Sequence, residues 1–80
     1  MQKSKSVKTL NLLERGRWGK ITAVPHGILR AQFVRLGIHE GERVKCLEHL
    51  PGGTVVIQKN RQQIALGNQL AKQIHVIEIA

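Results

Sequence analysis

Residues 28–44 read ILRAQFVRLGIHEGERV, and this stretch contains the pattern that decides the fold. Its first part has apolar residues at helical spacing, with Leu29 and Phe33 forming an i,i+4 pair. Gly37 stands where the C-terminal cap of a helix favours a residue with positive φ. Gly41 then marks a tight turn before a segment that reads as a strand. The stretch therefore predicts a helix that ends just before Gly37, followed by a corner and a strand.

The predicted helix has two faces with different expected roles. Ile28, Ala31 and Val34 form an apolar stripe, and we expect this stripe to pack against the barrel. Arg30 and Arg35 lie on the opposite face, where we expect them to be solvated. The same two arginines are candidates for docking on an acidic protein surface.

Short strands on both sides of this stretch indicate a mainly β fold. Alternating and β-branched residues predict strands at 18–24, 42–50, 54–59, 62–66 and 74–79. The sequence Pro51-Gly52-Gly53 predicts a hairpin turn, and a short helical turn is expected near the C-terminus with Asn68 as its N-cap. About five short strands with tight turns favour a small closed or nearly closed barrel with one inserted α-helix, because closure removes exposed strand edges.

Length and charge limit what the chain can be. Eighty residues are enough for one domain with a small core, and we expect a loose basic tail at residues 1–7 before a domain at residues 8–80. The formal net charge of +8 favours an acidic partner. Trp18 and Phe33 are the only aromatic residues, which disfavours a protein that stacks bases of single-stranded nucleic acid. We expect Trp18 in the core or the wall of the barrel.

Three further features of the sequence indicate a soluble, cytoplasmic protein. The single cysteine, Cys46, cannot form an internal disulfide, and this fits a reducing compartment. No apolar run approaches the roughly 18–20 residues that a membrane span needs. The basic start of the chain lacks the apolar segment of a secretory signal.

No combination of residues in the sequence predicts catalysis, a bound cofactor or a metal site. Cys46 and His49 have the spacing of a metal half-site, but positions i and i+3 of a regular strand point to opposite faces. We therefore expect Cys46 to be a small core residue. Gly52 and Gly53 do not form a phosphate loop, because no helix N-terminus follows them to receive an anion.

The order of these segments resembles the FeoA family, the small cytosolic proteins of bacterial ferrous iron uptake. The resemblance extends over about residues 8–80. Its matching positions are Thr9-Leu10-Asn11-Leu12-Leu13, Gly16, Gly19-Lys20-Ile21, Leu36-Gly37-Ile38, Gly41, Val44, Ile64-Ala65-Leu66, the turn at 68–73 and Ile74-His75-Val76. Trp18 departs from the family pattern, in which a smaller residue usually precedes the glycine. The resemblance implies an SH3-like barrel with a helix inserted after the first strand.

The resemblance also implies a non-enzymatic accessory protein that docks on the membrane permease FeoB, which has a cytosolic GTP-binding domain, and modulates transport. We expect the docking surface to include Arg30, Arg35, Leu36, Ile38 and Lys45. The basic charge leaves an alternative open, a small-barrel domain that binds nucleic acid or regulates transcription, as do related domains fused to iron-dependent repressors. Nucleic acid is the less favoured partner. Self-association through apolar residues at the rim of the barrel also stays open.

Overall fold

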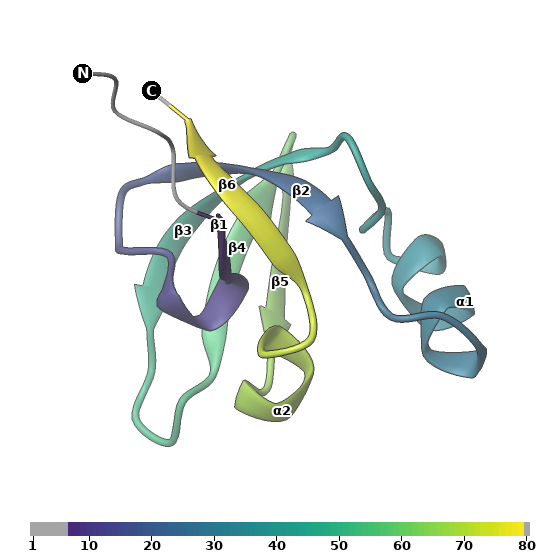
Figure 1. Cartoon of the computed structure of the whole chain (residues 1–80). Coiled ribbons are helices and arrows are strands. Elements are labelled where there is room, and N and C mark those ends of the chain that lie inside the picture. Colours follow the sequence, from purple (N-terminus) through teal and green to yellow (C-terminus); the bar gives the residue numbers. More distant parts are fainter. Residues whose placement is uncertain (1–6, 80) are drawn as a thin grey trace.

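The computed structural model describes residues 7–79, and Figure 1 shows these residues as a curved sheet with short helices. In chain order the elements are β1 (Val7–Thr9), the 3₁₀ helix η1 (Leu10–Leu12), β2 (Trp18–Ala23), α1 (Ile28–Arg35), β3 (Arg43–His49), β4 (Val55–Lys59), β5 (Gln62–Leu66), α2 (Asn68–Ala71) and β6 (His75–Ile79).

The strands form one antiparallel sheet in the order β1-β6-β2-β3-β4-β5. The strand β6 therefore lies between the two N-terminal strands, as its position in Figure 1 shows. All the predicted strands are present, and β1 is an additional one. The predicted tail lies outside the described residues as far as residue 6, whereas Val7 already belongs to β1.

The concave side of the sheet encloses the core. Strands, helices and the segments between them all contribute apolar side chains to it, and the predicted core position of Cys46 is confirmed. The buried apolar residues are Leu10, Leu13, Ile21, Val24, Phe33, Ile38, Val44, Cys46, Val55, Ile57, Leu66, Ala71, Ile74 and Val76.

The end of α1 has the hydrogen bonds of a Schellman motif, as the glycine at its end predicted. Gly37 has φ of +83°, and its N–H donates to the carbonyl of Val34 at 2.9 Å. The N–H of Ile38 donates to the carbonyl of Phe33 at 2.8 Å, and the Ile38 side chain is fully buried. This motif turns the chain sharply away from the helix and towards β3.

The helix packs on the barrel through a different face from the one predicted. Phe33 is buried and Leu29 packs against the core, whereas Ile28 is 81% exposed and Val34 is 47% exposed. At about 100° per residue, Ala31 stands about 160° from Phe33 around the helix axis. The prediction that the stripe of Ile28, Ala31 and Val34 packs inward was therefore wrong, because the Leu29–Phe33 pair occupies the inward face.

Two smaller predictions also need correction. Asn68 is the first residue of α2, not its N-cap, since Gly67 occupies the cap position without any side-chain hydrogen bond. Of the two places expected for Trp18, the core is wrong and the wall is right, because Trp18 lies on the outer face of β2 and is 38% exposed. The residue after Trp18 points into the core and must be small. A Cβ at Gly19 would lie only 3.2 Å from a methyl group of Leu13.

Candidate protein-docking surface

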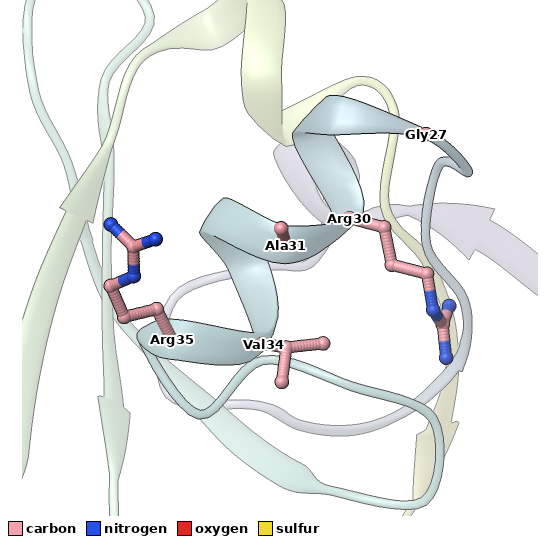
Figure 2. Close-up of a pocket in the computed structure, with 5 residues that line it drawn as sticks. All are labelled: Gly27, Arg30, Ala31, Val34 and Arg35. Atoms are coloured by element: carbon pink, nitrogen blue, oxygen red, sulfur yellow. The ribbon is translucent and has the colours of Figure 1, made fainter.

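The outward face of α1 forms a shallow, open groove, which we call the helix surface (Figure 2). The groove has a volume of about 560 Å³ and is lined by Gly27, Arg30, Ala31, Val34 and Arg35. Figure 2 shows the side chains of Ala31 and Val34 between the two arginines, which extend to opposite sides of the helix. The helix surface thus combines an apolar centre with a cation on each side.

The two arginines of the helix surface have different surroundings. Arg30 forms a two-pronged ion pair with Glu40, in which Nη1 and Nη2 lie 2.9 and 3.0 Å from the two carboxylate oxygens. The hydrogen bond from Arg30 lowers the pKa of Glu40 to about 2, and the pKa of Arg30 is raised in turn. Arg35 is exposed and has no ion pair with any acid within residues 7–79. Arg35 is therefore the arginine whose charge is free to meet a partner.

Apolar residues continue the helix surface beyond the groove. Ile28 begins α1 and is largely exposed, and Leu36, the C-cap residue, is also exposed. Exposed apolar side chains beside arginines are the composition found at the centres of protein–protein interfaces. Arg30, Arg35 and Leu36 are thus where the predicted docking surface places them, whereas Ile28 and Val34, predicted to lie inside, are exposed.

The structure does not bring all five predicted docking residues together. Ile38 is fully buried under the corner after α1, where it cannot contact a partner. Lys45 lies in β3, opposite Trp18 of β2 and Gln58 of β4, and does not line the groove of α1. The helix surface thus includes three of the five, and the contribution of Lys45 belongs to the sheet.

Cys46 and His49 lie closer together than their spacing predicted. The register between β3 and β4 shifts between Cys46 and Glu48, and this bulge brings Sγ of Cys46 within 3.5 Å of Nε2 of His49. The expectation that these side chains point to opposite faces was therefore wrong.

The Cys46–His49 contact is nevertheless not a metal half-site in this geometry. Nε2 of His49 also lies 2.8 Å from the carbonyl oxygen of Leu13, which can only accept, so this nitrogen carries the proton. Burial raises the pKa of the Cys46 thiol, which disfavours the thiolate that a metal needs. In the described part of the chain, no group of three or more His, Cys, Asp or Glu side chains could hold an ion.

A family model of the FeoA domain matches residues 8–78, nearly the whole chain. This chain belongs to the FeoA family. The family is associated with ferrous iron transport and is not known as a family of enzymes. None of the curated protein sequences matches this FeoA protein.

Solved structures confirm the fold of this FeoA protein. A crystal structure of an iron uptake regulatory protein (FeoA) is 25% identical, with a TM-score of 0.84, and the match covers 92% of this chain and 100% of that one. FeoA of Stenotrophomonas maltophilia, complexed with zinc and described as an SH3 domain protein, is 24% identical with a TM-score of 0.72, and the match covers 85% of this chain and 87% of that one. The predicted SH3-like fold is thus confirmed.

The same fold also occurs inside a longer regulator. A manganese-dependent transcriptional repressor is 18% identical with a TM-score of 0.84, and the match covers 96% of this chain but only 44% of the repressor. At this identity the likeness shows the fold alone. Between residues 7 and 79, no helix of this FeoA protein is long and apolar enough to cross a bilayer.

Proposed function

We propose that this protein is a non-enzymatic accessory factor of bacterial ferrous iron uptake, which docks on the cytosolic part of a FeoB-type permease and modulates transport. The family supports the connection with ferrous iron. The observation that carries the docking proposal is the helix surface, in which Ile28 and Val34 are exposed beside Arg30 and Arg35. Burying these side chains against a partner would remove apolar area from water, which favours association.

The charges of the helix surface suggest how the encounter is made. Arg35 forms no ion pair within residues 7–79, so it can pair with a carboxylate of the partner. Arg30 is held by Glu40 and offers a cation of fixed position. Lys45, on β3, adds to the positive field that steers an acidic partner, although it lies on another surface. Leu36 extends the apolar contact at the end of α1.

A binding titration tests the proposal. Purified protein would be titrated against the cytosolic domain of the FeoB permease from the same organism, and against the intact permease in detergent, at low salt. We expect Ile28→Asp to weaken binding at least tenfold, because a carboxylate would replace an exposed apolar side chain of the docking surface and would be desolvated on binding. Leu12→Asp is the matched control, since Leu12 is exposed in η1, on the opposite side of Figure 1 from α1. Absence of wild-type binding to both targets, or equal losses in the two variants, would contradict the proposal.

A further inference from the structure

The outer face of the sheet presents a second exposed surface, and the strand register defines its members. One row across the strands consists of Val7, Ile77, Lys20 and Arg43, each directly opposite the next. The adjacent row consists of Ile79, Trp18, Lys45 and Gln58. We call these two rows the strand surface. The residues that alternate with them along the strands, such as Gly19, Val44 and Val76, are buried, so both rows face outward.

One half of the strand surface is cationic. Lys20 and Arg43 stand directly opposite each other, and Lys45 follows on the same face of β3. In the described part of the chain, none of these three forms an ion pair, whereas Lys8 and Arg17 both pair with Glu78. Like charges directly opposite each other on paired strands lower stability. An anionic partner would relieve this repulsion.

The other half of the strand surface is apolar. Val7 is 58% exposed and Trp18 is 38% exposed, while Ile77 and Ile79 are half-buried beside them. Trp18 pairs with Ile79 on one side and with Lys45 on the other, so it lies where the apolar half of the strand surface meets the cationic half. Tryptophan is enriched where apolar and aqueous phases meet, and lysine and arginine beside it attract anionic headgroups.

The combination favours a lipid surface over nucleic acid. The phosphates of a nucleic acid could bind Lys20, Arg43 and Lys45. The three exposed or half-exposed aliphatic side chains in the same two rows would contribute nothing to that binding. A bilayer interface uses both halves, because aliphatic groups enter the boundary of the acyl chains while the cations bind headgroups. The acid Glu48 lies opposite Val56, one row beyond Lys45, and marks the limit of the cationic half.

We propose that the strand surface binds the headgroups of anionic phospholipids, with Trp18 and its aliphatic neighbours at the membrane interface. This binding is peripheral and reversible. It concerns a different surface and a different kind of partner from the docking on FeoB, so either proposal can fail without the other.

The test uses the whole chain and vesicles of defined composition. Co-sedimentation would compare vesicles of phosphatidylcholine alone with vesicles of phosphatidylglycerol and phosphatidylcholine in equal parts. We expect binding to the anionic vesicles only, weakening as salt rises. Trp18 is the single tryptophan, so its fluorescence reports on the surface directly and should shift to shorter wavelength on binding. An unchanged spectrum with bound protein would contradict the proposal.

Two variants with the same loss of charge distinguish binding by the strand surface from a general effect of net charge. The double variant Lys20→Gln/Arg43→Gln should bind the anionic vesicles about 25-fold more weakly, at roughly fivefold for each cation. The control Arg61→Gln/Lys72→Gln removes the same charge from exposed positions outside the two rows, and it should bind much more tightly than the first variant. Both should stay folded by circular dichroism. Equal losses in the two variants, no sedimentation with anionic vesicles at low salt, or binding of duplex DNA without vesicle binding would each overturn the proposal.

Discussion

Arg30 and Glu40 form a two-pronged ion pair, at 2.9 and 3.0 Å, that ties the first turn of α1 to the corner following its last turn. The ion pair therefore joins two parts of the 28–44 segment, the helix and the corner after it, from which the fold was predicted. It also fixes one of the two arginines of the helix surface. Both side chains remain in contact with water, so the pair positions the arginine more than it stabilises the fold.

The ion pair predicts how Glu40 titrates. Its pKa in the folded protein is about 2, below the ordinary value of about 4.3 for the unfolded chain. The stabilising effect is therefore fully present above the unfolded pKa and is lost as pH falls towards the folded one. We expect an NMR titration of the Glu40 carboxyl to show the low midpoint, and Arg30→Gln to return it to the ordinary range. A wild-type midpoint near the ordinary value would contradict the pairing in solution.

Adjacent glycines in the hairpin between β3 and β4 predict different costs of substitution. Gly52 and Gly53 have φ of +91° and +95°, so an alanine at either costs about 1–2 kcal/mol of unfolding free energy. A Cβ at Gly53 would also lie 2.8 Å from Cβ of Asn68, whereas nothing lies within 4 Å at Gly52. We expect Gly53→Ala to cost about 1–3 kcal/mol more than Gly52→Ala in urea unfolding. Equal urea midpoints would show that the hairpin does not rest on α2.

The orientation of α1 predicts a large loss of stability at one apolar position and almost none at another. Phe33 is in the core, so Phe33→Ala should lower the free energy of unfolding by about 3–5 kcal/mol. Ile28 is exposed, and Ile28→Ala should change it by no more than about 0.5 kcal/mol. Chemical unfolding of both variants measures this contrast. A large loss of unfolding free energy in Ile28→Ala would contradict this orientation and support the prediction that the apolar stripe packs inward.

The corner residues Leu36 and Ile38 should separate stability from binding. Ile38→Val should cost about 0.5–1.5 kcal/mol of stability and leave affinity for the FeoB cytosolic domain unchanged, because the side chain is buried. Leu36→Ala should weaken that binding with little effect on stability, since Leu36 is exposed. Parallel unfolding and titration experiments compare the two. Loss of affinity in a folded Ile38→Val variant would mean that the corner itself is recognised.

The buried thiol of Cys46 predicts slow chemical modification. Burial keeps the thiol protonated at neutral pH, and the side chain has no exposed surface. A thiol reagent should therefore react only through opening of the native structure, at a rate that rises with denaturant. His49→Ala serves as the comparison, because it removes the side chain that contacts Sγ, and we expect it to speed the labelling. Rapid labelling of the native wild type would show that Cys46 is accessible.

Local features of this protein were readable from its sequence. The cap at Gly37 depends on residues within one helical turn, so φ preference and spacing sufficed to predict it. The hairpin glycines and the β-branched run of β4 are equally local signals. Strand β1 was missed because three residues carry no periodicity, and its place is fixed by pairing with β6 far along the chain.

The surfaces were harder to predict because they depend on distant contacts. In a helix of eight residues, both the Leu29–Phe33 pair and the stripe containing Val34 are apolar, and only packing decides which faces inward. The approach of Cys46 to His49 follows from a bulge set by the register with β4. The strand surface required the pairing of β2 with both β3 and β6, which no segment of the sequence reveals alone.

The place of β6 between β1 and β2 has a consequence for biosynthesis. Both β1 and β2 hydrogen-bond to β6, and the contact of Lys8 with Glu78 joins positions 70 residues apart. On the ribosome, β2 can pair with β3 early, but β1 and the other edge of β2 stay unpaired until His75–Ile79 have emerged. Such long-range pairing slows folding compared with helical proteins of the same size. A nascent chain that stalls before His75 would expose two strand edges at once, and it would depend on chaperones or meet degradation.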